Sequence, residues 1–335
     1  MGKRCLEYAG IFCCLFFSLL AALSVGRYIV PFKEVCGILL SYIASIEPFW
    51  TDVQYRVVTL IRVPRVLGAG LAGATLAMAG AALQAILKNP LVSPQVIGVS
   101  TGAAFGGVLA ILLFESSLAT MGLAYAGGLV SLTAVWVLCN RGRGTSPLSL
   151  VLGGIIINAF FTALISLIEY VADPYDKLPS IVVWLMGSFA SLSYDKLLRS
   201  APPLLVAGAL LWMLRFRINV LSLGSEEAQS LGIDVTRTRW LVMAVVAMVA
   251  AATVAMAGVV GWIGLVVPHI TRMFVGNDHK RLVPLSCFLG GMYTILVDTL
   301  ARTLVEVEIP MGVLTALVGT PLFAFLMYRL MRDEK

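Results

Sequence analysis

Long apolar segments, separated by short polar clusters, follow one another along the whole chain. Each segment approaches the roughly 20 residues that an α-helix needs to cross a bilayer. The first follows Lys3 and Arg4, but it is too long for the apolar region of a signal peptide and has no convincing cleavage site, so we expect it to be retained. The pattern predicts about ten spans, near residues 8–28, 61–84, 94–114, 118–139, 148–171, 200–214, 240–257, 259–275, 282–304 and 310–329.

The composition agrees with a protein embedded in a membrane. Apolar residues make up 59% of the chain and charged residues 13%, about half the share usual in soluble domains, which excludes a soluble globular enzyme. We expect an all-α polytopic membrane protein with a single transmembrane domain over residues 1–335, in halves near 1–195 and 196–335. The similar helix interruptions Leu91-Val-Ser-Pro94 and Leu265-Val-Val-Pro268 favour two inverted five-helix repeats.

Charges are divided unevenly between the two sides of the predicted membrane. The chain has 24 basic and 18 acidic residues, a net charge of +6. With a cytoplasmic N-terminus, the inner segments hold 15 basic and 7 acidic residues and the outer segments 9 and 11, which is +8 inside and −2 outside. This split follows the positive-inside rule and predicts that both termini are cytoplasmic. The basicity thus reports topology and gives no support to a nucleic-acid partner.

Familiar motifs for nucleotide, metal and covalent chemistry are missing from the sequence. It has no G-x-x-x-x-G-K-[ST] loop, its two histidines form no H-E-x-x-H, and its six cysteines show no C-x-x-C spacing. The segment 68–73 matches G-x-G-x-x-G, but it lies inside a span and follows no strand. An intramembrane enzyme would also need a paired nucleophile and base. If the protein moves a solute uphill, another subunit must therefore supply the energy.

Two polar stretches interrupt the inner side. Asn89 to Pro94 contains two prolines, which stop one helix and start the next, and the Asn89 amide can bond the backbone groups left open there. This stretch is either a pathway element or a plain cytoplasmic turn. The loop at about 215–239 contains a short helix, for which Ser225 is the expected N-cap and Gly232 the left-handed terminator. That helix is either merely solvated or a docking site for a cytoplasmic partner.

Three arginines lie on the outer side, where positive charge should be scarce: Arg62, Arg65 and Arg302. They are either interface anchors or a positive rim for an acidic ligand or protein. Asp298 precedes Arg302 by one helical turn, so we expect these two side chains to pair.

The motifs together resemble a known family, the membrane permease subunits of ABC importers for ferric siderophores, haem and cobalamin. The resemblance covers nearly the whole chain. Its N-terminal signature comprises Arg62-x-Pro-Arg65, Gly73-Ala74, Gly80, Gln84, Asn89-Pro-Leu91, Pro94, Gly98-Val-Ser100 and Gly102-Ala103. Its C-terminal signature comprises Leu231-Gly232, Gly261, Ile263-Gly-Leu-Val-x-Pro268-His269, Arg272, Asp298, Ala301-Arg302 and Pro310-x-Gly312-Val-x-Thr315.

The resemblance implies a homodimer of ten-helix subunits in the inner (plasma) membrane of a prokaryote. Two cytoplasmic ATPase subunits, which hold ATP and Mg, and a periplasmic or lipid-anchored substrate-binding protein complete the importer. The chain itself would bind no cofactor or metal and would catalyse no reaction. The resemblance implies a metal chelate as substrate, a ferric siderophore or haem, with cobalamin or a molybdate-type oxyanion as the alternatives. A self-sufficient secondary transporter fits less well, because spans two, three, four and seven carry no ionisable group at mid-span.

The resemblance also implies residue roles. The outer arginines Arg62, Arg65 and Arg302 would meet acidic residues on the binding protein. The element that couples to the ATPase would comprise Ser225, Glu226, Glu227, Ala228, Leu231 and Gly232. The cytoplasmic gate would comprise Asn89, Leu91, Thr145 and Ser146. The fifth span would line the path with Asn158, Thr162, Ser166 and Glu169, a stripe that could equally hold helices together. Residues 179–190 resemble the short outer helix at the mouth of the path.

Overall fold

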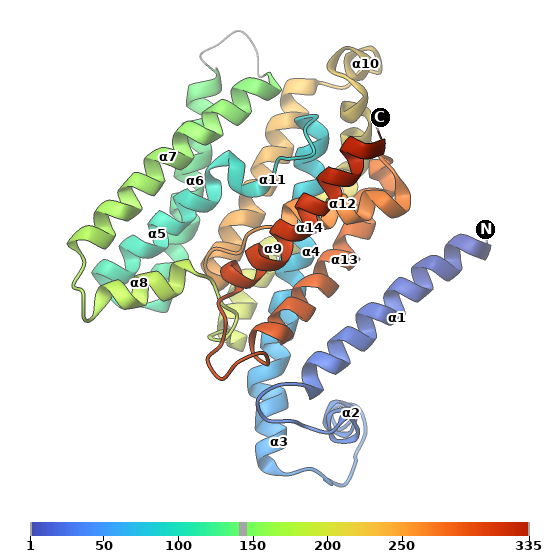
Figure 1. Ribbon diagram of the computed structural model, residues 1–335, viewed down its shortest axis with the longest axis vertical. Helices are drawn as coiled ribbons and strands as arrows, with labels where there is room; N and C mark the ends of the chain where they lie inside the picture. The colour runs from blue at the N-terminus through green and yellow to red at the C-terminus, as the bar shows by residue number, and fades with distance from the viewer. Residues whose placement is uncertain (1, 141–145, 334–335) are drawn as a thin grey trace.

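The helical segments predicted from the apolar pattern are present in the computed structural model, which describes residues 2–140 and 146–333 and has no β-strand among them (Figure 1). The α-helices are α1 (Gly2–Ser24), α2 (Phe32–Leu40), α3 (Asp52–Arg56), α4 (Val63–Ile86), α5 (Val99–Phe114), α6 (Ser117–Asn140), α7 (Pro147–Val171), α8 (Lys177–Leu185), α9 (Tyr194–Leu223), α10 (Ser225–Ser230), α11 (Val235–Ala257), α12 (Ile263–Val275), α13 (His279–Ala301) and α14 (Met311–Asp333). A π-helical turn, η1 (Val57–Arg62), joins α3 to α4, and a 3-10 turn, η2 (Pro94–Ile97), precedes α5.

Six of these helical segments are long and apolar enough to cross a membrane: Asp52–Ile86, Ser117–Asn140, Pro147–Val171, Tyr194–Leu223, Val235–Ala257 and His279–Ala301. Shorter apolar helices at Cys14–Ser24, Val99–Phe114, Ile263–Val275 and Met311–Phe325 coincide with the other four predicted spans. The span predicted at 200–214 is too short, because α9 continues through charged residues at both of its ends. Ser193 starts this helix by accepting a hydrogen bond from the Lys196 amide.

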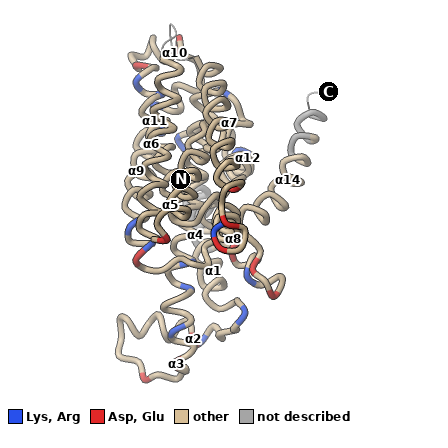
Figure 2. Tube along the Cα trace, turned by 90° about the vertical axis from the view of Figure 1, so that its left-hand side faces the viewer, with Lys and Arg blue, Asp and Glu red and all other residues tan. Residues whose placement is uncertain are grey.

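Charged residues gather toward the two ends of the bundle (Figure 2). The end with α10 is the predicted cytoplasmic side, and the opposite end carries α2, α3 and α8 (Figure 1). In Figure 1, α1 runs from the N-terminus toward α2, and α14 runs back toward the end that carries α10. The placement of both termini on one side stays a prediction. The inverted repeat stays a prediction.

Helices α4 and α11 form the interior of the bundle. Buried residues make up 78% of the apolar windows of both, against about a third in α6 and α7. Small residues allow α4 to touch its neighbours backbone to backbone. A Cβ atom at Gly73 would lie 2.4 Å from the Gly290 carbonyl oxygen on α13, and one at Gly80 would lie 1.8 Å from the Gly264 carbonyl oxygen on α12. Such close approach is how membrane helices pack without a hydrophobic drive between them.

A Gly80→Ala variant is therefore expected to unfold at a lower temperature or denaturant concentration. The added methyl group collides with backbone, which cannot rotate away, and overpacking costs about 1–3 kcal/mol or more. Gly122→Ala on α6 is the matched control, because a Cβ atom there meets nothing within 4 Å. Equal stability of the two purified variants would contradict this packing.

Candidate functional site

A π-helical turn sets the position of the first two outer arginines. Pro64 has no N–H to donate, and its ring would clash with the carbonyl group of residue 60 in a regular α-helix. The helix widens instead, and the Val63 amide donates to the Val58 carbonyl oxygen, five residues back. The Thr59 carbonyl oxygen accepts a hydrogen bond from the Tyr194 hydroxyl of α9 at 2.7 Å. The Arg62-Val-Pro-Arg65 motif thus fixes its own backbone, and Tyr194 ties it to α9.

Arg62 and Arg302 cap the C-terminal end of α1. Arg62 Nη1 donates to the Leu23 carbonyl oxygen at 2.6 Å and to the Ser24 carbonyl oxygen at 2.9 Å, and its Nη2 donates to the Tyr28 carbonyl oxygen. Arg302 Nη2 donates to the Ala22 carbonyl oxygen. The last carbonyl groups of a helix lack partners within it, and this end of the helix dipole attracts cations. These two arginines therefore fasten α1 to α4 and α13.

Arg65 is the centre of a buried ion-pair network. Its Nε atom donates to the Asp298 carboxylate at 2.9 Å and its Nη2 atom does so at 2.8 Å, a bidentate pair across two helices. Arg65 also bonds Glu308, through Nη1 at 3.2 Å and through Nη2. The Ser188 hydroxyl donates to Glu308 at 3.3 Å. The network joins α4, α13, the loop before α14 and the loop after α8.

The predicted Asp298–Arg302 pair is wrong. Helix α13 ends at Ala301, and Arg302 has φ −98° and ψ 0°, so the regular one-turn geometry stops before it. Asp298 pairs with Arg65 instead. The exposed fractions of Arg62, Arg65 and Arg302 are 3%, 5% and 6%. The three arginines lie together at the outer end, but they point inward, so an acidic partner could reach them only by displacing the α1 carbonyl groups or the carboxylates.

An Arg62→Gln variant is expected to loosen the end of α1. A hydrogen bond to a charged group is worth about 1.5–3 kcal/mol, and the variant loses several to carbonyl groups. Faster amide hydrogen exchange in the last turn of α1 would report this loss. Arg56→Gln is the control, because Arg56 is an exposed arginine six residues earlier in the same helical segment. Identical exchange in the two variants would contradict the capping role.

The short outer helix lies close to its expected place. Helix α8 spans Lys177–Leu185, within the outer part of the molecule, and the following residues are fixed from two sides. The Ser188 amide donates to the Ala257 carbonyl oxygen of α11 at 2.8 Å, and the Met311 amide donates to the Gly187 carbonyl oxygen at 2.8 Å. The loop after α8 therefore connects α11 to the start of α14.

At the inner end, the predicted gate segment is attached to two helices. The Asn89 side chain accepts from the Leu91 amide at 2.9 Å, as the sequence predicts. Gln84 Nε2 donates to the Val92 carbonyl oxygen at 3.2 Å, and Gln84 Oε1 accepts from Arg272 of α12. Lys88 Nζ donates to the Leu223 carbonyl oxygen, the last residue of α9, at 3.0 Å. The sequence predicts neither the Arg272 nor the Lys88 contact.

The other two gate residues adjoin the start of α7. Thr145 lies outside the described residues. Ser146 is the N-cap of α7 and accepts from the Ser149 amide at 3.1 Å. Leu91 is exposed.

The predicted coupling helix is α10, and its predicted N-cap is wrong. Its N-cap is Gly224, and Ser225 is already helical, with its hydroxyl accepting from Arg239 at 2.8 Å. Ala228 is fully buried, because the inner face of this one-turn helix packs against the bundle. Gly232 has φ +77°, which confirms the left-handed terminator. Glu226, Glu227, Leu231 and Gly232 are exposed at this end, and Leu231 is 65% exposed.

The polar stripe of the fifth span lies along one edge of the uncovered face of α7. Thr162 and Ser166 are exposed, and Asn158 and Glu169 are half-buried. The Thr162 hydroxyl donates to the Asn158 carbonyl oxygen at 2.7 Å, so the hydroxyl is satisfied within the helix. Helix α7 lies at the edge of the bundle in Figure 1. The stripe therefore faces out of this subunit and contributes little to packing within it.

Among the residues that the structure describes, no group of three or more His, Cys, Asp or Glu side chains is arranged to hold a metal ion. The described residues form a helical bundle in which arginine hydrogen bonds and ion pairs connect the helices at the outer end. The short helix α10 is exposed at the inner end, and a polar stripe lies along α7 between the two ends.

A family model and several known proteins match the chain over most of its length. The model of the FecCD transport family matches residues 14–329. The molybdate import system permease protein MolB of Haemophilus influenzae is 41% identical over 96% of this chain and 95% of its own length. A probable iron chelatin transport system permease protein of Helicobacter pylori is 40% identical over 80% of this chain and 81% of its own.

A solved structure matches as well. It shows an inward-facing conformation of a metal-chelate type ABC transporter, and its chain superposes with a TM-score of 0.86 at 40% identity. The match covers 96% of this chain and 98% of that one.

Proposed function

The chain belongs to the FecCD transport family, and on that premise we propose that it carries a metal chelate, a ferric siderophore or haem, from a binding protein into the cytoplasm. It is the permease subunit of an ABC importer and not an enzyme. The observation that carries this assignment is the family match over residues 14–329 in a chain without a nucleotide-binding loop. As a multi-pass membrane protein, it is proposed to lie in the inner (plasma) membrane of a prokaryote.

ATP and Mg are proposed to bind to two separate ATPase subunits, which dock on α10. The exposed Leu231 and Glu226 at the inner end support this docking site. Lys88, which bonds the end of α9 next to α10, offers a route from the docked ATPase to Asn89 and Leu91. Movement of α10 would then pull on the gate segment through one hydrogen bond. A partner must bind the two states of the gate unequally, because equal affinity shifts nothing.

The exposed face of α7 is proposed to meet a second copy of the chain across the translocation path. Exposed Thr162 and Ser166 support this proposal, because a stripe that faces out of the subunit is free to line a path between two copies. The binding protein is proposed to dock on the outer end. There, Arg62, Arg65 and Arg302 brace the docking surface, and direct contact with acidic residues requires them to leave their present partners.

A molybdate-type oxyanion is the second candidate substrate, favoured by the 41% identity to a molybdate permease. Cobalamin is the third. Uptake by proteoliposomes that contain the permease, its ATPase and its binding protein separates them. We expect radiolabelled iron chelate or haem to accumulate and excess molybdate not to compete. If molybdate accumulates and an excess of chelate does not inhibit its uptake, the proposed metal-chelate substrate is wrong. The assignment as an ABC importer permease would be unaffected.

A further inference from the structure

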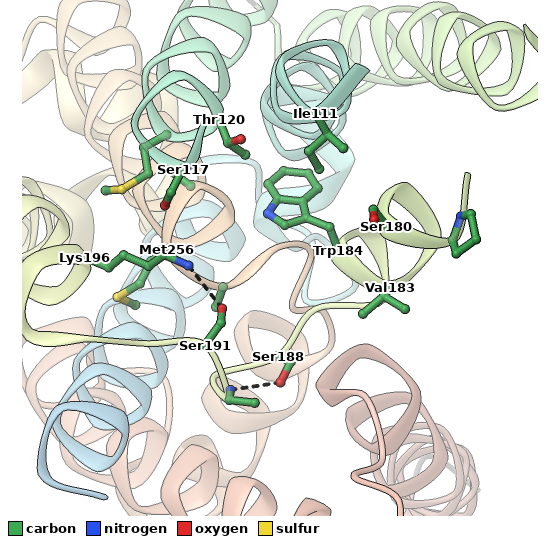
Figure 3. A pocket seen from close by; sticks show the side chains of 15 residues that line it. Ile111, Ser117, Thr120, Ser180, Val183, Trp184, Ser188, Ser191, Lys196 and Met256 are labelled. Atoms are coloured by element: carbon green, nitrogen blue, oxygen red, sulfur yellow. Dashed lines mark hydrogen bonds between the residues drawn. The ribbon is translucent and has the colours of Figure 1, made fainter. Parts of the chain in front are cut away.

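A cavity of about 560 Å³ lies beside α8, on the predicted outer side, and part of its lining belongs to residues 179–190, the segment expected at the mouth of the path (Figure 3). Its walls come from α8, the start of α6, the loop after α8 and the ends of α9 and α11 that face them. The volume lies within the range of about 300–1,000 Å³ that is usual for sites of small organic ligands. It is therefore large enough for far more than a single ion.

The cavity has a mainly apolar wall with scattered hydroxyl groups and one charged side chain, Lys196. Met121, Val183, Trp184 and Met256 are among its apolar lining residues, and its hydroxyl groups come from Ser117, Thr120, Ser180, Ser188 and Ser191. Lys196 and Ser191 lie together at one side of the view in Figure 3, and Lys196 Nζ donates to the Ser191 hydroxyl at 3.2 Å. An ammonium group has three donors, so two of its N–H groups remain for a ligand.

Lys196 has no acidic partner in the part of the chain that the structure describes. Its neighbour Asp195 pairs with Arg199 at 2.8 Å. Two carboxylates near the cavity, Glu115 and Asp176, both pair with Lys177. The hydrogen bond from Lys177 also lowers the pKa of Glu115. A partly buried ammonium without a counter-charge is unfavourable unless something supplies one.

We propose that this cavity binds an amphiphilic anion, with its carboxylate or phosphate group at Lys196 and Ser191 and its apolar body against Trp184 and Met256. A bare oxyanion fits poorly, because one ammonium group and a mainly apolar wall cannot replace its hydration shell. An apolar body gains from burial roughly in proportion to the area removed from water. The anion can come from a phospholipid of the outer leaflet or from an organic chelate; the second source rests on the proposed function.

Dodecyl phosphate is the probe for this site. We expect it to change the tryptophan fluorescence of the protein saturably in phosphatidylcholine nanodiscs, and a Trp184→Phe variant to lose most of that change. Dodecanol, with the same chain but no charge, and inorganic phosphate, with no chain, should bind far more weakly. Lys196→Gln should weaken dodecyl phosphate binding at least about tenfold, and Lys196→Arg should largely preserve it. Lys280→Gln is the control, because Lys280 is an exposed lysine at the inner end.

Equal binding of dodecyl phosphate by wild type and Lys196→Gln, or equal binding of inorganic phosphate, would overturn the site. Competition experiments against dodecyl phosphate identify whether the natural anion is a lipid or a chelate. Phosphatidylglycerol in the nanodisc should compete in wild type if the anion is a lipid, and haemin, an apolar ring with carboxylates, should compete if it is a chelate. If the reconstituted importer takes up no chelate at all, the proposed substrate fails, whereas lysine-dependent dodecyl phosphate binding still establishes the cavity.

Discussion

Replacing Arg65 by glutamine is expected to destabilise the protein by roughly 3–5 kcal/mol, the cost of breaking a buried ion pair by removing one partner. Asp298, which is 1% exposed, would lose the bidentate partner that compensates its burial. Glu308 would lose its hydrogen bonds to Arg65 as well. Denaturant unfolding of the purified variants in a fixed detergent measures the loss.

Arg199→Gln is the matched control for this prediction. Arg199 also pairs with an aspartate, Asp195, at 2.8 Å, but both members of this pair are exposed. A surface pair of this kind is worth about 0–1 kcal/mol. The double variant Arg65→Gln with Asp298→Asn should recover part of the stability, because no uncompensated charge is left at Asp298. An Arg65→Gln loss no larger than that of Arg199→Gln would contradict the network.

Changing Leu231 to arginine is expected to lower ATP-driven uptake by at least about tenfold if Leu231 is a hot spot of the proposed ATPase interface, since changing a hot-spot residue costs about 2 kcal/mol or more. Leu231 lies at the inner end and is 65% exposed. The fold should therefore tolerate the change. Copurification of the ATPase subunits and uptake by proteoliposomes measure the effect.

Two further variants make the Leu231 result interpretable. Ile43→Arg changes an apolar residue that is 88% exposed at the opposite end, and it should leave ATPase copurification unchanged. Ala228→Arg is a poor probe of docking, because Ala228 is fully buried and a charged side chain there would disturb the fold itself. If the ATPase subunits copurify normally with the Leu231→Arg variant and uptake is normal, α10 is a solvent-exposed loop helix and not the ATPase docking site.

Local rules account for what the sequence predicts correctly. The apolar runs place the helices, Asn89 bonds the backbone beside its own proline, and Gly232 takes the left-handed conformation. Each of these depends on neighbours within a few residues. Pro64 carried a further local signal, a missing N–H, from which the π-helical turn could have been foreseen.

Pairings between distant residues could not be read from one sequence. Arg302 lies one helical turn from Asp298, whereas Arg65 is 233 residues away in the sequence. Asp298 pairs with Arg65 because α4 packs against α13, which a single sequence does not reveal. Glu308 was missed because nothing nearby in the sequence marks it as a partner. The inward face of α10 was missed for a similar reason: six residues are too few to define an apolar stripe.

ATP-dependent uptake is the most direct test of the central claim, that this chain is the permease of an ATP-driven importer. Proteoliposomes would contain the chain alone, or the chain with its ATPase subunits, with the binding protein and a radiolabelled iron chelate supplied outside. We expect accumulation only when both the ATPase subunits and internal ATP are present. Accumulation by the chain alone, without ATP, would contradict the claim and identify a self-sufficient transporter.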